Sequence, residues 1–398
     1  MKKDKSMSHF SFVLISQLIR FLAFFFVGYR HKGRYKIKKD EPVLVFSNHQ
    51  TDIDSVLVNL SFSRLLHTVA TDNIFKKGFM TWLLDKFGTI PKRKGAIDLN
   101  STMQMVKTIR NKQSVLVFPE GNRAYAEFQF YVTPSISRLV KATKATLVIF
   151  NLHGGNGTRP RFGKKPRHGK FYGEIKKIMK YDEYKDLSDE ELCKIIVDNL
   201  RVFDSESGLL FKSKTRAEYL ERMMFVCPSC HKAQTLYSKR ELITCNNCGF
   251  QAEFTENLHL KTSDSSINYT RLLDWYQYQI DWVKQFEPKD NSNIFIDENV
   301  KLVTAETRKK SRLVAKGTMV LTKDCLKIGE VSFDLANIEV ASPVSGTKLL
   351  FTYLDKAYEV QGHERFNPLK YAFMFNKLDT HMHKTGKDNY FTLEDVIK

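Results

Sequence analysis

Residues 42–54 read PVLVFSNHQTDID and join a short apolar run to a histidine and an aspartate. The run 43–46 is typical of a fully buried strand, because it is short, unbroken and closed by a turn-forming Ser-Asn pair. In open α/β sheets, ligands bind at the carboxyl ends of strands, which is where His49 falls. A helix that begins at Thr51 or Asp52 is expected to follow.

His49 and Asp54 are five residues apart. On one straight helix this step would turn the two side chains away from each other, so they meet only if His49 lies in the turn and Asp54 in the first helical turn. A carboxylate beside a histidine orients the ring and stabilises the imidazolium that forms when the ring takes a proton. The alternative is a capping role, with Thr51 as the N-cap, Asp54 at the third position and His49 as a loop residue.

Apolar strands and amphipathic helices alternate over the first half of the chain, which is typical of an α/β domain with a mixed sheet. The expected elements are strands at 67–71, 114–118 and 146–151, and helices at 74–87 and 98–110. A capping box at Ser188 and Glu191 predicts a last helix, so this domain is expected to close near Asp204.

Two further stretches place polar side chains near the same edge of the sheet. Residues 118–123 read FPEGNR and follow the strand 114–118, so Glu120, Gly121 and Arg123 are expected on the rim that carries His49. Residues 88–93 read GTIPKR, in which Arg93 supplies a cation suited to a phosphate group.

In this order the three stretches resemble the conserved blocks of the glycerolipid acyltransferase family, which includes 1-acylglycerol-3-phosphate acyltransferases. The first block is met by Asn48, His49 and Asp54, the second by Gly88, Ile90, Pro91 and Arg93, and the third by Phe118, Pro119, Glu120, Gly121 and Arg123. The fourth block, a hydrophobic strand that usually carries prolines, corresponds to residues 147–150, which contain none. The resemblance covers about residues 30–204.

The resemblance implies an O-acyltransferase in which His49 deprotonates the hydroxyl of a lysophospholipid acceptor, most simply lysophosphatidic acid, and phosphatidic acid is the product. Asp54 would orient His49, Arg93 and Arg123 would hold the acceptor phosphate, and Glu120 would bind the glycerol or support Arg123. The acyl donor is a thioester, either acyl-CoA or an acyl carrier protein. Direct transfer is expected, because no Ser or Cys stands in a nucleophile setting, and no catalytic metal is implied.

The net charge of +19 favours an anionic partner such as an acidic membrane surface, an acidic carrier protein or nucleic acid. Residues 10–29 form a long apolar run interrupted by Gln17 and Arg20 and flanked by basic residues. We interpret this run as a membrane-associating helix at an anionic, cytoplasmic membrane surface. A buried core helix and a cleaved signal peptide are the alternatives. The cationic loop 154–170 is either solvated surface or a phosphate or membrane contact.

Four of the six cysteines form two Cys-x-x-Cys pairs separated by fourteen residues, namely Cys227, Cys230, Cys245 and Cys248. This spacing fits one tetrahedral structural zinc in a small ribbon, since each pair can sit in one tight turn. A redox role would need a single pair, and four unrelated buried thiols would leave the paired spacing unexplained.

The C-terminal part reads as a connecting helix and then short alternating strands with a final helix at 368–378, which weakly resembles a pleckstrin-homology-like domain. The expected organisation is a membrane-associating helix at 1–30, an acyltransferase domain at 31–205, a zinc ribbon at 223–256, a connecting helix at 262–288 and a β-rich domain at 294–398.

A rival from another class is a zinc-ribbon module that binds nucleic acid or docks another protein through Lys232, Lys239 and Arg240 while the sheet domain is inactive. We expect no nucleic-acid partner, because this rival leaves the three ordered blocks unexplained. The ribbon and tail could also serve an active enzyme as protein-docking or lipid-sensing appendages.

Overall fold

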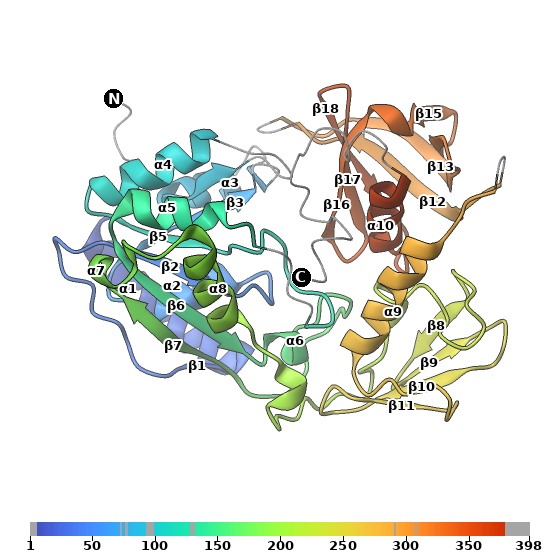
Figure 1. The fold of residues 1–398 in the computed structure, drawn as a ribbon, viewed down its shortest axis with the longest axis horizontal. Helices are drawn as coiled ribbons and strands as arrows, with labels where there is room; N and C mark the ends of the chain where they lie inside the picture. The colour runs from blue at the N-terminus through green and yellow to red at the C-terminus, as the bar shows by residue number, and fades with distance from the viewer. Residues whose placement is uncertain are drawn as a thin grey trace. The chain divides into compact units, whose positions relative to one another are not determined.

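The structure is a computed structural model, and Figure 1 shows its helices and strands. It describes residues 6–71, 74–75, 79–92, 99–127, 132–289, 292–306 and 309–378. The chain divides into two compact units. The first contains Met1–Pro160 and His168–Leu209, and the second contains Arg161–Arg167 and Leu210–Lys398.

The first unit is built on a seven-stranded mixed sheet with the order β1-β7-β6-β2-β5-β3-β4. The central strands are parallel, whereas β7 runs antiparallel to β6, which confirms the predicted mixed α/β fold. The strands are β1 (Tyr29–His31), β2 (Val43–Ser47), β3 (Leu66–Thr71), β4 (Ile90–Lys92), β5 (Ser114–Val117), β6 (Thr146–His153) and β7 (Phe171–Met179). The sequence patterns missed β1, β4 and β7, which are short or carry alternating polar residues.

Helices cover both faces of this sheet (Figure 1). In β2, Leu44 and Phe46 belong to one core cluster and Val43 and Val45 to the other, as expected when successive side chains point to opposite faces of a doubly covered sheet. The helices are α1 (His9–Leu22) with its continuation η1 (Ala23–Val27), α2 (Asp54–Leu60), α3 (Phe79–Lys86), α4 (Leu99–Arg110), α5 (Ser135–Thr143), α6 (Gly155–Thr158), α7 (Tyr181–Tyr184), α8 (Asp189–Leu200) and the 3₁₀ turn η3 (Asp204–Glu206).

One helix start differs from the sequence-based expectation. Helix α2 begins at Asp54, not at Thr51 or Asp52, because the preceding residues form a turn around the Asp54 carboxylate. The predicted helix 74–87 is described as α3 from Phe79 to Lys86, and residues 76–78 before it lie outside the described residues. The capping box before α8 is confirmed, since the Ser188 hydroxyl accepts from the Glu191 N–H and the Glu191 carboxylate accepts from the Ser188 N–H.

The segment His9–Val27 is long and apolar enough to cross a membrane, with a mean hydropathy of 2.1, and only 17% of it is buried. Its bulky side chains face outward: Phe10 is 78% exposed and Phe26 is 77% exposed. The alternative of a buried core helix is therefore wrong. Phe12 and Ser16 are buried, so one side of the helix contacts the protein while most of its apolar surface does not.

The second unit contains two antiparallel sheets. The smaller has the order β11-β10-β9-β8, with β8 (Leu236–Lys239), β9 (Leu242–Cys245), β10 (Gln251–Phe254) and β11 (Leu260–Thr262). It follows the 3₁₀ turn η4 (Leu220–Arg222) and precedes helix α9 (Leu272–Gln285). Trp275 of α9 is fully buried and donates its indole N–H to the Val226 carbonyl, which fixes the helix to the first cysteine turn.

The larger sheet confirms the predicted β-rich C-terminal part, with the order β15-β14-β13-β12-β18-β17-β16. Its elements are β12 (Phe295–Thr304), β13 (Leu313–Leu321), β14 (Cys325–Ile328), β15 (Val331–Asp334), the 3₁₀ turn η5 (Leu335–Asn337), β16 (Ile338–Ser345), β17 (Lys348–Tyr353), β18 (Lys356–Gln361) and helix α10 (Pro368–Leu378). The sequence pattern missed β12, in which charged residues interrupt the apolar ones. The pleckstrin-homology-like assignment stays a prediction.

The cationic loop 154–170 is neither simply solvated nor free for an anion along its whole length. Arg161 and Arg167 are 8% and 7% exposed, and their guanidinium groups donate to the carbonyls of Pro343 and Arg216. These two cations therefore serve the packing of the second unit.

Candidate active site

His49 lies in the turn after β2 and Asp54 is the first residue of α2, so the five-residue spacing brings the two side chains together. The Nδ1 atom of His49 is 2.8 Å from Oδ2 of Asp54. Asp54 is fully buried, whereas 23% of the His49 side chain is exposed. The imidazole therefore has one edge held inside the protein and another that solvent can reach.

The Asp54 carboxylate is held by neighbours on both sides. Its Oδ2 accepts the backbone N–H groups of Gln50 at 2.6 Å and Thr51 at 2.8 Å, and its Oδ1 accepts the Thr51 hydroxyl. The N-cap residue Ile53 makes no side-chain capping bond. The alternative with Thr51 as the N-cap is therefore wrong: Thr51 supports the carboxylate that holds His49.

The hydrogen bond to Asp54 selects one tautomer of His49. A carboxylate only accepts hydrogen bonds, so Nδ1 of the neutral ring carries the proton and Nε2 keeps its lone pair. Nε2 is then the atom of this ring that can take a proton from a ligand.

The loop after β5 packs directly on His49. The Phe118 and His49 rings are stacked with centroids 4.3 Å apart, and the His49 carbonyl accepts the Ala124 N–H at 2.7 Å. The first and third sequence blocks are thus brought together, although about seventy residues separate them.

Asn48 connects this turn to the strand next to β2. Its side-chain amide donates to the Leu152 carbonyl at 2.9 Å and its carbonyl oxygen accepts the Leu152 N–H at 2.8 Å. Asn48 is 5% exposed, so both bonds are shielded from water. The position of His49 is therefore fixed by the central strands β2 and β6, not by the turn alone.

The predicted residues of the third block surround a turn. Gly121 donates its N–H to the Phe118 carbonyl at 3.0 Å and has a φ of +67°, a conformation that favours glycine. Glu120 is 3% exposed, Gly121 is exposed and Arg123 is half-buried. Arg93 lies outside the described residues, so its predicted place beside the site is not tested.

A small cavity of about 20 Å³ adjoins His49, enough for about one water molecule. It is lined by Asn48, His49, Gln50, Glu120, Ala124, Glu127, Asn156, Leu200, Arg201 and Val202. Of the predicted site residues, the cavity brings together His49 and Glu120.

The sequence patterns missed Gln50 and Glu127, which line this cavity, and Asp204, which is bonded to Gln50. Gln50 donates to Oδ2 of Asp204 at 3.2 Å and accepts the Gly155 N–H at 2.9 Å. Asp204 also accepts the Gly154 N–H at 2.6 Å, and Glu127 accepts the Ser205 N–H at 2.8 Å. Gln50 could have been found from its position in the sequence between His49 and Thr51. Asp204 and Glu127 lie in segments without a recognisable sequence pattern.

Asp204 is fully buried, and its surroundings disfavour its charge. Burial raises its pKa from 3.8 to about 8, with a further contribution from the negative charge of Glu127. The hydrogen bonds from Gly154, Asn156 and Gln50 oppose this rise without cancelling it. The carboxyl group that is bonded to Gln50 therefore keeps its proton to a higher pH than an exposed aspartate does.

A second cluster lies in the other unit. The ligand atoms of Cys227, Cys230, Cys245 and Cys248 all lie within 4.8 Å of one another. The Sγ atoms of Cys227 and Cys248 are 3.7 Å apart, as are those of Cys230 and Cys245. A tetrahedron with Zn–S bonds of about 2.3 Å has sulfur atoms roughly 3.8 Å apart, so this cluster has the dimensions of a four-thiolate metal site.

The two cysteine turns have the same backbone geometry. The residue after each pair donates its N–H to the carbonyl of the pair's first cysteine: His231 to Cys227 at 3.0 Å, and Gly249 to Cys245 at 2.9 Å. Both donors have a positive φ, +58° for His231 and +77° for Gly249. The His231 ring contacts the Tyr278 hydroxyl and is not among the four candidate ligands.

Comparison with known proteins finds similarity within the first unit. Residues 28–150 match the sequence model of the family described as Acyltransferase. This segment contains all three sequence blocks.

One curated relative is the 1-acyl-sn-glycerol-3-phosphate acyltransferase of Saccharomyces cerevisiae, which is 32% identical over 90 residues. The matched region is 21% of this chain and 29% of the yeast protein, so the chain spans less than a third of that relative's length. Among solved structures, the crystal structure of the 1-acyl-sn-glycerophosphate (LPA) acyltransferase PlsC from Thermotoga maritima aligns with a TM-score of 0.42 and 19% identity. The alignment covers 48% of this chain and 76% of that one.

Proposed function

We propose that this chain transfers a fatty acyl group from a thioester to the free hydroxyl of a lysophospholipid, because residues 28–150 match the sequence model of the family described as Acyltransferase. The observation that carries the proposal is the hydrogen bond between Nδ1 of His49 and the buried Asp54 carboxylate inside the matched segment, which assigns the basic lone pair of this partly exposed imidazole to Nε2. Lysophosphatidic acid is the proposed acceptor, because the yeast relative is named for that type of acceptor.

In the proposed reaction, Nε2 of His49 takes the proton from the acceptor hydroxyl as its oxygen attacks the thioester carbonyl. The carbon–sulfur bond then breaks, and the proton passes from the imidazolium to the departing thiolate. Asp54 stabilises the imidazolium and keeps the ring in place. A positioned base of this kind contributes roughly 10² to 10⁴ to the rate.

Arg123 and Arg93 are proposed to bind the acceptor phosphate, because guanidinium groups bind phosphates through two parallel hydrogen bonds. Glu120 is proposed to accept a glycerol hydroxyl, and Gly121 to let the backbone turn beside it. Support comes from the stacking of Phe118 on His49, which holds the strand end before these residues against the histidine.

The acceptor is a membrane lipid, so we place the protein on a membrane surface, with the exposed apolar helix α1–η1 in the bilayer interface and the protein on the cytoplasmic side. The net charge of +19 favours an anionic membrane and an acidic donor, either acyl-CoA or an acyl carrier protein. The four cysteines are proposed to bind a structural zinc ion that supports the second unit and takes no part in the transfer.

The surface around the four cysteines argues against the alternative in which the ribbon binds nucleic acid. A stacking platform needs open aromatic faces, but the Arg365 guanidinium lies 4.2 Å from the centre of the Tyr237 ring. Lys232 is engaged with the side chain of Asn247 at 2.9 Å.

A direct test incubates the purified protein in anionic vesicles with labelled acyl-CoA or acyl carrier protein and a panel of lysophospholipids. We expect transfer to lysophosphatidic acid to be fastest. Transfer to other head groups only would correct the acceptor, and absence of transfer to every acceptor would refute the enzyme assignment.

A further inference from the structure

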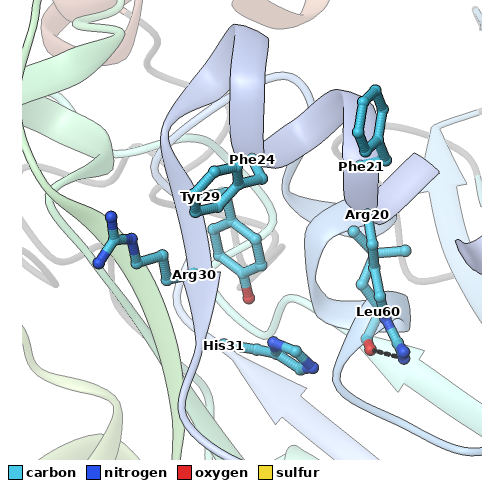
Figure 2. Close-up of a pocket in the computed structure, with 7 residues that line it drawn as sticks. All are labelled: Arg20, Phe21, Phe24, Tyr29, Arg30, His31 and Leu60. Atoms are coloured by element: carbon cyan, nitrogen blue, oxygen red, sulfur yellow. Dashed lines mark hydrogen bonds between the residues drawn. The ribbon is translucent and has the colours of Figure 1, made fainter. Parts of the chain in front are cut away.

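A second cavity, separate from the His49 site, lies where the apolar N-terminal helix turns back into the sheet (Figure 2). Its volume is about 270 Å³, and its lining residues are Arg20, Phe21, Phe24, Tyr29, Arg30, His31 and Leu60. Gly28 has a φ of +69° and ends the helix, so the chain reverses and β1 returns beside η1. No described residue lines both cavities.

The cavity is basic on its polar side. Its lining contains two guanidinium groups and an imidazole, and none of its described lining residues is acidic. Figure 2 shows Arg20 and Arg30 on opposite sides of the Tyr29 ring. Burial and the nearby charges of Arg20 and Arg34 lower the pKa of His31, so at neutral pH its ring is available as a neutral hydrogen-bond donor.

The guanidinium group of Arg20 uses only part of its hydrogen-bonding capacity within the described part of the chain. Its Nη2 donates to the Leu60 carbonyl at 2.6 Å, at the carboxyl end of α2 (Figure 2). Its Nε is buried and has no hydrogen-bond partner among the residues that the structure describes. A buried donor without an acceptor is unfavourable, so the protein does not use the full hydrogen-bonding capacity of this cavity-lining guanidinium group.

The opposite side of the cavity is apolar and continues into the exposed face of the helix. Phe21 is 60% exposed and Phe24 is 46% exposed, and the neighbouring Phe25 and Phe26 are also exposed. Aromatic side chains favour the boundary between lipid tails and head groups, and arginines near the end of a membrane helix reach toward the phosphates. A free inorganic anion would use only the basic half of such a cavity.

We propose that this cavity binds the phosphate head group of an anionic phospholipid in the bilayer, with the first part of its acyl chains against Phe21 and Phe24. This lipid is a fixed component of the membrane contact and is neither the acyl donor nor the acceptor. The inference rests on the proposed membrane placement of the helix and is independent of the transfer reaction.

The test measures binding of the full-length protein to phosphatidylcholine vesicles with and without an anionic phospholipid. Removal of each cavity arginine, by Arg20→Gln or Arg30→Gln, is expected to weaken binding to anionic vesicles about five-fold, and both together about 25-fold. Arg20 also donates a hydrogen bond to the Leu60 carbonyl, whereas Arg30 is exposed, so Arg30→Gln is the variant expected to disturb folding less.

The matched control is the double variant Arg110→Gln with Lys177→Gln, which removes two exposed charges that do not line the cavity. It is expected to bind anionic vesicles within about two-fold of the parent. Equal weakening in the control and cavity variants would show that diffuse charge, not the cavity, binds the membrane, and would overturn the proposal.

Acyl transfer in neutral detergent micelles is measured on the same preparations and should be unchanged in the cavity variants. A parent protein that binds vesicles but transfers no acyl group refutes the proposed enzyme without affecting this inference. A parent that binds both vesicle types equally refutes this inference alone. Saturable binding of radiolabelled inorganic phosphate that is lost in Arg30→Gln would assign the site to the free ion and overturn the lipid assignment.

Discussion

The histidine site and the cysteine site both begin with a short spacing in the sequence, but the protein completes them in different ways. Each cysteine turn is closed by its own backbone hydrogen bond, from His231 to Cys227 and from Gly249 to Cys245. Once the two turns meet, their four sulfur atoms form a cluster that could hold a metal ion, and within the described residues this cluster contains no ligand from any other segment.

The histidine site depends on segments far along the chain. Asn48 is tied to Leu152 of β6, Gln50 to Asp204, and the carbonyl of His49 to the loop after β5. Substitution of one of the four cysteines should therefore unfold the protein locally, around the cysteine turns. Damage to the histidine pair should be a loss of chemistry in a protein that otherwise remains folded.

The largest effect is expected from removal of the proposed zinc ion. Structural zinc sites in zinc-finger peptides bind with an apparent free energy of about 10–16 kcal/mol, comparable to the whole stability of a typical domain. Cys245→Ser, or treatment with a chelator, should therefore unfold the ribbon, measured as loss of bound zinc and new protease cleavage within residues 223–256.

The control is Cys325→Ser, since Cys325 is a free cysteine outside the cluster. It should keep one zinc per chain and the parent cleavage pattern. Acyl transfer should survive Cys245→Ser within a few-fold; complete loss of transfer together with the zinc would contradict the independence of the two sites.

The second largest effect should follow Asp54→Asn. The Asp54 carboxylate accepts four hydrogen bonds, whereas an asparagine amide has only one acceptor oxygen. Its NH₂ group would therefore face another donor, either the backbone N–H groups of Gln50 and Thr51 or the Thr51 hydroxyl. We expect acyl transfer to fall about 10²-fold or more and the free energy of unfolding to fall by about 1–3 kcal/mol.

Asp52→Asn is the matched control two residues away, because the Asp52 side chain is 62% exposed. Its effect on stability should stay within about 0.5 kcal/mol, with transfer near the parent rate. Similar rates for the Asp54 and Asp52 variants would show that the buried carboxylate does not orient the base.

A smaller, pH-dependent effect is expected from Asp204. Its pKa is raised to about 8 in the folded protein, so the folded state holds a proton that the unfolded state loses near pH 3.8. This contribution to stability is complete below that pH and is lost as the pH rises toward 8, by up to about 1.4 kcal/mol per pH unit.

The measurement compares urea unfolding of the parent and Asp204→Asn at about pH 5 and about pH 8. The parent should lose stability relative to the variant as the pH rises, because only the parent can ionise at this position. A stability difference that does not change between the two pH values would show that Asp204 is not protonated in the fold.

The smallest effect concerns the helix that closes the first unit. Ser188→Ala removes the N-cap bond to Glu191 and should cost about 1 kcal/mol, whereas Ser188→Gly should cost only a few tenths. Thermal unfolding measures both, with no change in acyl transfer. Equal melting temperatures for the parent and Ser188→Ala would show that the cap contributes nothing.

The parts that could be predicted from the sequence are those where local chemistry decides the outcome. The apolar run in β2, the capping box at Ser188 and the cysteine spacing each carry their structural cause within a few residues. Strands β1, β4 and β7 were not predicted, because their place in the sheet depends on neighbouring strands that come from distant segments of the chain. Asp204 and Glu127 were missed for the same reason, because the fold and not a sequence motif brings Asp204 to Gln50 and Glu127 to Ser205.

The start of α2 shows how a correct pattern can lead to a wrong local assignment. Thr51 has the chemistry of an N-cap, yet its hydroxyl donates to Asp54 and the helix begins three residues later. A threonine that caps a helix and a threonine that supports a buried carboxylate use the same hydroxyl oxygen, so the sequence alone could not separate the two roles.

We propose that His49 is the general base of the acyl transfer and that the domain folds without it. The most direct measurement is the rate of acyl transfer by purified His49→Ala protein, taken together with its zinc content and its thermal unfolding. We predict a rate at least about 10²-fold lower than the parent, with one zinc per chain and an unchanged melting profile. Transfer at the parent rate by the folded variant would contradict the account.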